Sequence, residues 1–224
     1  MGKKYGTNIL SVMCAIGQAA AYMANNGAKV VALDLTREMI EEGNKRFQDI
    51  PNLTFVQADV CDFCLDRTFD FCFISSADIH LLPSLSEVKK ALVNINKHLK
   101  MGGGLGIEAW YAPEVSFSSP MRQFYPRVPR KDGVLIWKES QSEYNAETKI
   151  QHIHQIVHVD NENLQFTHDV DLQLYDRVDL LNLLSECGFT LVNAYCNNSF
   201  QTSDNITDNC YLELIKSSEI DRSK

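Results

Sequence analysis

The part of the sequence that decides the fold is NILSVMCAIGQAAAYMANNG, residues 8–27, followed at once by KVVALD, residues 29–34. Residues 8–12 are mostly apolar, as in a short buried strand, and the alanine-rich part beyond Gly17 has helical spacing and ends at Gly27. Residues 29–34 form a second apolar run that ends in Asp34. The order strand, turn, helix, strand predicts the first unit of a parallel α/β sheet.

The same alternation continues along the chain. The expected elements are a helix at 37–47, strands at 53–57 and 69–74, a helix at 85–99 and a strand at 104–110. Strands that alternate with helices in this way predict a Rossmann-like, doubly wound and mostly parallel sheet with helices on both faces.

The sequence changes character after Tyr111. Four prolines between residues 113 and 129 indicate a loop, and three β segments then follow at 134–142, 149–159 and 164–174. A helix at 177–187 and strands at 191–195 and 210–216 return to the α/β pattern. We therefore expect one domain over residues 1–224, with an antiparallel β-meander insertion over residues 112–175 that serves as a substrate cap or an oligomer interface.

Composition narrows the classes of partner. The 21 Lys and Arg against 29 Asp and Glu give a net charge of −8, which argues against nucleic acid and anionic membranes as partners. No apolar run approaches the roughly 20 residues that span a bilayer, so we expect a cytoplasmic protein.

Metal chemistry has little support in the sequence. The seven cysteines show no pattern of a secreted scaffold, so we expect reduced thiols, and the single pair Cys61 and Cys64 has no second CxxC to complete a zinc site. His152, His154 and His158 share one face of an expected strand, but no nearby acid or cysteine completes a ligand set in the sequence pattern. We therefore expect no metal.

The turn after the first strand and the acid after the second indicate the kind of ligand. In open α/β sheets, ligands bind at the carboxyl ends of the strands, and an acid ending the second strand accepts hydrogen bonds from ribose hydroxyls. The turn contains only one glycine, Gly17, and neither G-x-G-x-x-G nor a P-loop is present. These features favour an adenosine-containing cofactor without a pyrophosphate.

Several segments resemble motifs of the class I methyltransferases, which use S-adenosylmethionine. ILSVMCAIGQ at 9–18 is similar to the first motif of that family, and DLTREM at 34–39 to its second-strand acid and loop. QADV at 57–60 resembles the third motif, FDFCFI at 69–74 the fourth strand, and LQLY at 172–175 with the helix at 178–187 the end of small-molecule members. The resemblance covers nearly the whole chain, from residue 8 to about residue 216.

The resemblance implies S-adenosylmethionine as cofactor and assigns residues to it. The turn would contact the methionine part, Asp34 the ribose, Leu35 and Met39 the adenine ring, and Asp59 with the Val60 backbone the adenine edge. The full set implied is Met13, Cys14, Ala15, Gly17, Gln18, Asp34, Leu35, Met39, Asp59, Val60 and Ser75.

Methyl transfer needs an aligned acceptor and, for a hydroxyl or ammonium acceptor, removal of a proton. The candidates for this work are His80, Glu108, Tyr111 and Arg122, the arginine being suited to hold a carboxylate. The expected activity is N- or O-methylation of a small molecule.

The first motif also departs from the family pattern. Ser11 stands where the family usually has an acid, and Met13 and Ala15 stand where it has glycine or a small residue. Two alternatives therefore stay open: a catalytically inactive scaffold or regulatory subunit, and an enzyme that redirects the sulfonium chemistry, for example by intramolecular cyclisation.

Only seven residues precede residue 8, where family members commonly have helices that cover the cofactor. We therefore expect a homodimer, or a partner chain that covers this face.

Overall fold

A computed structural model of the chain describes residues 4–112, 121–130, 132–160, 164–196 and 209–220. The chain divides into two compact units, Met1–Tyr111 together with Asp176–Lys224, and Ala112–Tyr175. Each is described by itself. Among the described residues, no helix combines the length and the apolar character needed to cross a membrane.

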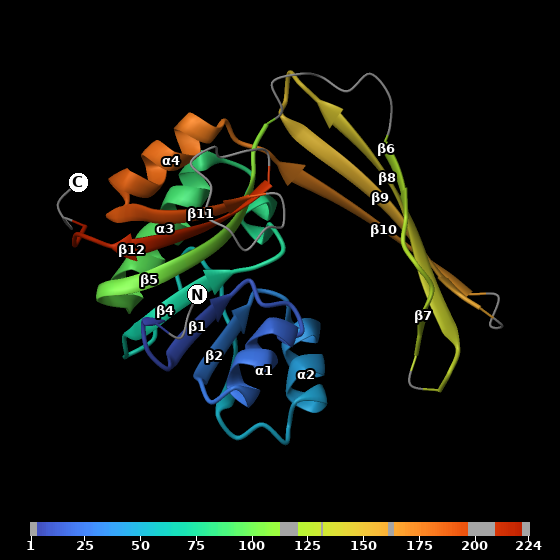
Figure 1. Cartoon of the computed structure of the whole chain (residues 1–224), viewed down its shortest axis with the longest axis horizontal. Coiled ribbons are helices and arrows are strands. Elements are labelled where there is room, and N and C mark those ends of the chain that lie inside the picture. The colour runs from blue at the N-terminus through green and yellow to red at the C-terminus, as the bar shows by residue number, and fades with distance from the viewer. Residues whose placement is uncertain (1–3, 113–120, 131, 161–163, 197–208, 221–224) are drawn as a thin grey trace. The chain divides into compact units, whose positions relative to one another are not determined.

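The first unit is built on a seven-stranded sheet in the order β11-β12-β5-β4-β1-β2-β3 (Figure 1). Strands β1 to β5 run parallel, whereas β12 pairs antiparallel with β5 and β11 antiparallel with β12. The strands are β1 (Asn8–Val12), β2 (Lys29–Asp34), β3 (Leu53–Gln57), β4 (Phe69–Ile74), β5 (Leu99–Trp110), β11 (Phe189–Cys196) and β12 (Asn209–Lys216). The predicted Rossmann-like, mostly parallel fold is therefore confirmed.

The helices connect the strands of this sheet. They are α1 (Gln18–Asn25), α2 (Arg37–Arg46), the 3₁₀ helix η2 (Asp78–Leu81), α3 (Leu85–His98) and α4 (Arg177–Glu186). Ser84 caps α3 through its side chain, which accepts a hydrogen bond from the backbone N–H of Glu87. The boundary after α3 differs from the prediction: the chain passes directly from His98 into β5, which therefore begins five residues earlier than expected.

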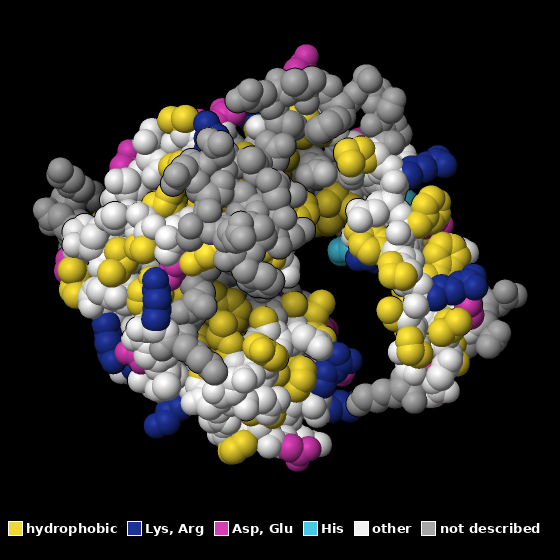
Figure 2. Space-filling view, viewed as in Figure 1, with side chains coloured by type: hydrophobic (Ala, Val, Ile, Leu, Met, Phe, Trp, Pro, Cys, Tyr) yellow, Lys and Arg dark blue, Asp and Glu magenta, His cyan; other side chains and the backbone are white. Residues whose placement is uncertain are grey.

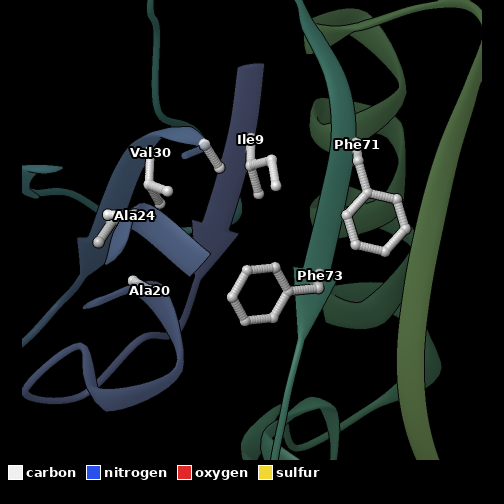
Figure 3. Packing of buried hydrophobic residues seen from close by; sticks show 8 residues of the cluster. Ile9, Ala20, Ala24, Val30, Phe71 and Phe73 are labelled. Atoms are coloured by element: carbon white, nitrogen blue, oxygen red, sulfur yellow. The ribbon is translucent and has the colours of Figure 1, made fainter. Parts of the chain in front are cut away.

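A buried apolar cluster fixes α1 on the sheet. Figure 3 shows Phe71 and Phe73 of β4 together with Ile9 of β1, Val30 of β2, and Ala20 and Ala24 of α1. All six are less than 10% exposed. Small alanines on the helix let it lie close to the sheet, which brings the turn between β1 and α1 down onto the strand ends.

The second unit is an antiparallel sheet in the order β10-β9-β8-β6, with β7 paired to β8. Its strands are β6 (Met121–Phe124), β7 (Val128–Pro129), β8 (Leu135–Asn145), β9 (Ile150–Val159) and β10 (Leu164–Gln173). The expected meander corresponds to β8, β9 and β10, whereas β6 and β7 lie where only a loop was expected. A proline is compatible with β7 because this strand has only two residues and pairs on one side.

Exposed apolar side chains are frequent on the second unit. Figure 2 shows hydrophobic side chains along its sheet, and the exposed large ones are Met121, Phe124, Val128, Leu135, Leu164 and Phe166. The histidines predicted to share a face each bond a carboxylate: His152 to Asp171, His154 to Asp169 and His158 to Glu139. These pairs account for the three histidines as polar ladder contacts.

One expectation about the cysteines is wrong. Cys210 on β12 is disulfide-bonded rather than reduced. The antiparallel register of β11 and β12 places Cys196 opposite Cys210, and sequence spacing alone does not reveal such cross-strand proximity.

Candidate active site

The order of the strands locates the site. Strand β1 lies between β2 and β4, so the chain leaves β1 toward one edge of the sheet and later returns to its other side. At such a switch point the carboxyl ends of neighbouring strands border a crevice that binds ligands. The segments that meet there are the turn from Met13 to Gly17, the loop after Asp34, and the loop from Ser75 to η2.

The turn after β1 has an unusual backbone. Met13, Ala15 and Gly17 all have left-handed conformations, with φ of 54°, 48° and 79°. Such a conformation costs a residue other than glycine roughly 1–2 kcal/mol. Met13 and Ala15 therefore keep the backbone path that glycine would take in this turn, and the structure tolerates the cost.

Asp34 holds this turn in place. Its Oδ2 accepts a hydrogen bond from the Ala15 N–H at 2.7 Å, and its Oδ1 accepts one from the Thr36 N–H at 2.9 Å. The carboxylate thereby ties the end of β2 to the β1 turn and to the start of α2. Each oxygen retains a further acceptor position, which suits the hydroxyl groups of a ribose.

Two exposed apolar residues follow Asp34 in the sequence. Leu35 is 65% exposed and Met39 is 40% exposed, although both are large hydrophobic residues. A carboxylate beside exposed apolar side chains matches a nucleoside, whose ribose is polar and whose base packs on apolar surface. The geometry of the described residues therefore fits the adenosyl part of the expected cofactor.

Gly17 has a packing requirement of its own. A Cβ at this position would collide with the ring of Phe55 on β3, and Gly17 is buried at the start of α1. The neighbouring residues of the predicted set, Cys14 and Gln18, are half-buried and exposed respectively. The glycine is thus explained by its contact with Phe55 and by its positive φ.

Asp59, in the loop after β3, makes a hydrogen bond within that loop. Asp59 Oδ1 accepts a hydrogen bond from the Cys61 N–H at 2.8 Å, forming a turn directly after the strand. The Val60 side chain is only 5% exposed, and its carbonyl oxygen accepts a hydrogen bond from Asn94. Burial thus restricts any role of Val60 in ligand binding to its backbone, as the sequence-based prediction also had it.

The loop after β4 is strained and then turns into η2. Ser76 and Ala77 have φ of 60° and 58°, two consecutive left-handed residues that are not glycine. Backbone strain of this kind tends to occur at functional sites. Ser75 of the predicted set is half-buried at the start of this loop, and its carbonyl oxygen accepts a hydrogen bond from the Asp78 N–H.

His80 has a structural contact instead of the predicted catalytic one. Its side chain is fully buried, and its Nε2 accepts a hydrogen bond from the Trp110 backbone N–H at 2.9 Å. A side chain without exposed surface does not reach a soluble substrate. The histidine instead fastens η2 to the end of β5.

Asp78, which the sequence analysis did not single out, is the acid that η2 brings to the site. Burial, together with the negative charges of Asp34 and Glu108, raises the pKa of the Asp78 carboxyl to about 7. Burial and the charges of Asp34 and Asp78 also raise the pKa of the Cys14 thiol to about 12. Asp78 therefore lies within electrostatic reach of Cys14, Asp34 and Glu108, which come from the ends of three strands of the sheet.

Two predicted catalytic residues lie at the end of β5. Glu108 is half-buried, and its Oε1 accepts a hydrogen bond from the Trp110 indole at 3.3 Å. Tyr111 is 5% exposed, and its hydroxyl has no hydrogen-bond partner among the described residues. Burial raises the pKa of Tyr111 to about 12, so near neutral pH its hydroxyl is a donor and not a base.

Arg122, the fourth predicted catalytic residue, belongs to the second unit. It is exposed on β6, where it pairs in register with Gln141 of β8. In the first unit, Glu108 and Tyr111 lie at the end of β5, a strand that contacts η2. Arg122 lies in the second unit.

Comparison with known proteins shows which proteins this chain resembles. Residues 9–103 match a family model described as a methyltransferase domain. In structure, 94% of the chain superposes on 84% of an S-adenosylmethionine-dependent methyltransferase from Clostridium acetobutylicum, with a TM-score of 0.78 and 15% identity. Residues 9–103 thus resemble a methyltransferase domain, and the chain has the fold of the class I methyltransferases. The sequence resemblance to this family is therefore confirmed.

Two further methyltransferases are similar to this chain. The amino pentose methyltransferase CalS10 of Micromonospora echinaspora, solved with S-adenosylmethionine bound, superposes with a TM-score of 0.74 at 20% identity, over 94% of this chain and 83% of its own. A dTDP-3-amino-3,4,6-trideoxy-glucopyranose N,N-dimethyltransferase of Streptomyces venezuelae is 24% identical over 74% of this chain and 68% of its own length. The other curated relatives are matched over less than half of their length.

The comparisons also support the cofactor expected from the sequence. Among the methyltransferases that this chain resembles, CalS10 is solved with S-adenosylmethionine bound. In this chain Asp34 ends β2 at the switch point of the sheet, and the exposed Leu35 and Met39 follow it, where the sequence resemblance places the adenosyl part.

Proposed function

We propose that this methyltransferase transfers a methyl group from S-adenosylmethionine to the amino group of an amino sugar. The supporting observation is its similarity, in sequence and over nearly the whole chain in structure, to proteins described as amino-sugar N-methyltransferases. The structural similarity extends over 94–96% of the chain in the two solved sugar methyltransferases, which includes most of the insertion.

The charges at the strand ends agree with an amine acceptor. Asp34, Asp78 and Glu108 present carboxyl groups at one place, and the donor and a protonated amine are both cations. A carboxylate acceptor would be repelled there. This arrangement favours N-methylation over methylation of an acid.

We assign the cofactor contacts as follows. Asp34 accepts hydrogen bonds from the ribose hydroxyls, Leu35 and Met39 pack on the adenine, and the turn from Met13 to Gly17 borders the methionine part. When bound, the cofactor supplies an electrophilic methyl group on a sulfonium sulfur. The protein aligns the acceptor nitrogen with it and keeps water away.

We further propose that the insertion, residues 112–175, contributes to the acceptor site. Arg122 on β6 is an exposed cation of this unit and suits an anionic group of a nucleotide-linked sugar. Arg122→Ala is then expected to raise the KM for the acceptor while the affinity for S-adenosylhomocysteine stays the same. An unchanged KM would remove Arg122 from the acceptor site.

We propose that the chain forms a homodimer or a complex with a partner chain in the cytoplasm. The exposed apolar side chains of the second unit support such an assembly, and light scattering of the purified chain tests the homodimer. A monodisperse monomer at working concentration would contradict it.

The test of the function is calorimetric titration with S-adenosylmethionine and S-adenosylhomocysteine, followed by mass analysis of a reaction with a thymidine diphosphate 3-amino sugar. We expect saturable binding of both cofactors and a product that has gained one or two methyl groups. Binding without any methylated product would support the inactive scaffold, and release of methylthioadenosine would support the redirected chemistry.

A further inference from the structure

Asp78 has a position that suits a reacting group. It is the first residue of η2, which follows β4 directly and is fastened to the end of β5 by the hydrogen bond between His80 and the Trp110 N–H. The strained residues Ser76 and Ala77 redirect the chain just before it. Asp78 is thus half-buried directly after the carboxyl end of β4, within the electrostatic reach of Asp34 and Glu108.

The groups that face Asp78 come from every neighbouring strand end. They are Asp34 after β2, Glu108 on β5 and the Cys14 thiol in the β1 turn, and His80 lies on η2 itself. Burial, and after it the charges of the two carboxylates, make ionised Asp78 unfavourable, so its pKa is raised to about 7.

The other titratable groups of the site are less suited to take a proton. Both oxygens of Asp34 already accept backbone hydrogen bonds, and His80 is buried with its Nε2 occupied. The pKa values of Tyr111 and Cys14 are raised to about 12, so neither is a base at neutral pH. Glu108 accepts the Trp110 indole N–H. Asp78 is the remaining acid of this group.

An amine acceptor creates the need for such a group. Near neutral pH an aliphatic amine is largely an ammonium ion, whose nitrogen has no lone pair to attack a methyl carbon. A base is most effective when its pKa lies near the working pH. We propose that Asp78 binds the ammonium group of the acceptor and takes one of its protons before methyl transfer, as the general base of this methyltransferase.

The step balances. One N–H bond of the ammonium breaks, its electron pair stays on nitrogen, and the proton goes to an Asp78 carboxylate oxygen. The nitrogen pair then forms the new N–C bond as the C–S bond of the donor breaks, with its electrons left on sulfur. Asp78 returns its proton to solvent between turnovers. This inference rests on the proposed function, because only an amine acceptor requires it.

The experiment compares wild type with Asp78→Asn, with Asp78→Glu, and with the control Asp49→Asn at an exposed acid remote in sequence from the site. The rate of amine methylation is measured from pH 6 to 9 at saturating cofactor. Asp78→Asn is expected to lower kcat at pH 7 by about 100-fold or more, a typical loss for a general base. The loss should shrink toward pH 9, where the amine enters already deprotonated, and Asp78→Glu should restore part of the rate.

Two further readouts do not depend on turnover. Asp78→Asn is expected to bind S-adenosylhomocysteine within about threefold of wild type, because Asp78 is not assigned to the cofactor. It is also expected to raise Tm by about 5 °C at pH 8, and by much less at pH 4, because it removes a buried charge that is present only at high pH. An unfolded variant is therefore not the expected cause of lost activity.

The outcomes separate the two proposals. If Asp78→Asn keeps the wild-type rate at pH 7, the role of Asp78 is overturned while the proposed function stands. The same holds if the loss is equal at every pH, which indicates a positioning role. If wild type binds the cofactor but methylates no amine, the proposed function fails and the role of Asp78 fails with it.

Discussion

At the scale of single residues, the role of a side chain at this site depends on both its chemical type and its surroundings. Asp34 was expected to bind a ribose, and in the structure it also organises the protein, because it accepts hydrogen bonds from the Ala15 and Thr36 N–H groups. His80 was expected to be catalytic and is a buried structural acceptor. Asp78 was overlooked because an acid in a loop after a strand is common, and only its burial and its acidic neighbours distinguish it.

Asp34→Ala tests the first of these roles. Removal of the carboxylate eliminates the two charged hydrogen bonds that hold the turn, and it also eliminates the proposed contact with the ribose. Each such hydrogen bond contributes about 1.5–3 kcal/mol. We expect S-adenosylhomocysteine to bind at least 10-fold more weakly by calorimetry, with Asp49→Asn as the unaffected control. Equal affinities of the variant and wild type would remove Asp34 from the cofactor site.

At the scale of elements, the turn between β1 and α1 combines three left-handed residues with close packing. Ala15 is exposed, so only its backbone conformation matters, whereas Gly17 is buried against Phe55. The same kind of φ angle therefore has different consequences at the two positions. The difference can be measured with a pair of opposite substitutions.

Ala15→Gly is expected to change the free energy of unfolding by less than about 1 kcal/mol, and to raise it if relief of the left-handed strain exceeds the entropy that glycine adds to the unfolded chain. Gly17→Ala is expected to lower it by about 2 kcal/mol or more, because the new methyl group meets the Phe55 ring in an unfavourable backbone conformation. Urea unfolding measures both. A Gly17→Ala protein as stable as wild type would show that Phe55 can move aside.

At the scale of the whole molecule, one buried acid connects the two ends of the first unit. Glu213 on β12 is 1% exposed, and it accepts hydrogen bonds from Tyr5 at 2.9 Å, Asn193 at 2.7 Å and Tyr195 at 3.0 Å. Lys4 lies 2.5 Å from the same carboxylate. The segment before β1 is thereby joined to the β11–β12 hairpin, more than 180 residues away in the chain.

This cluster predicts that part of the free energy of unfolding is lost at acid pH. Burial acts to raise the pKa of Glu213, but the surrounding donors outweigh it and lower the pKa to about 2. Because the folded-state pKa lies below the ordinary value of 4.5, the ionised group stabilises the fold above about pH 4.5, and this contribution is lost as the pH falls toward 2.

Glu213→Gln is therefore expected to lower the free energy of unfolding by about 2–3 kcal/mol at pH 7 and by clearly less at pH 3. Glu42→Gln, which breaks an exposed ion pair with Arg46, is the control and should change it by less than about 0.5 kcal/mol. Urea unfolding at the two pH values gives the comparison. A difference that does not depend on pH would show that the charge of Glu213 is not responsible.

From the sequence alone, one can predict the succession of strands and helices along the chain, the resemblance to class I methyltransferases, and the acid at the end of β2. These depend on local patterns: apolar runs, helical spacing, and residues at fixed offsets from one another. The two short strands β6 and β7 escaped prediction because they have two to four residues and little pattern of their own.

The surroundings of the reactive side chains depend on the tertiary structure. In the folded chain His80 is buried and accepts the Trp110 N–H, Phe55 packs against Gly17, and the charges of Asp34 and Glu108 lie close enough to help raise the pKa of Asp78. Burial and electrostatic coupling depend on neighbours from distant parts of the chain, and no local pattern encodes those distances.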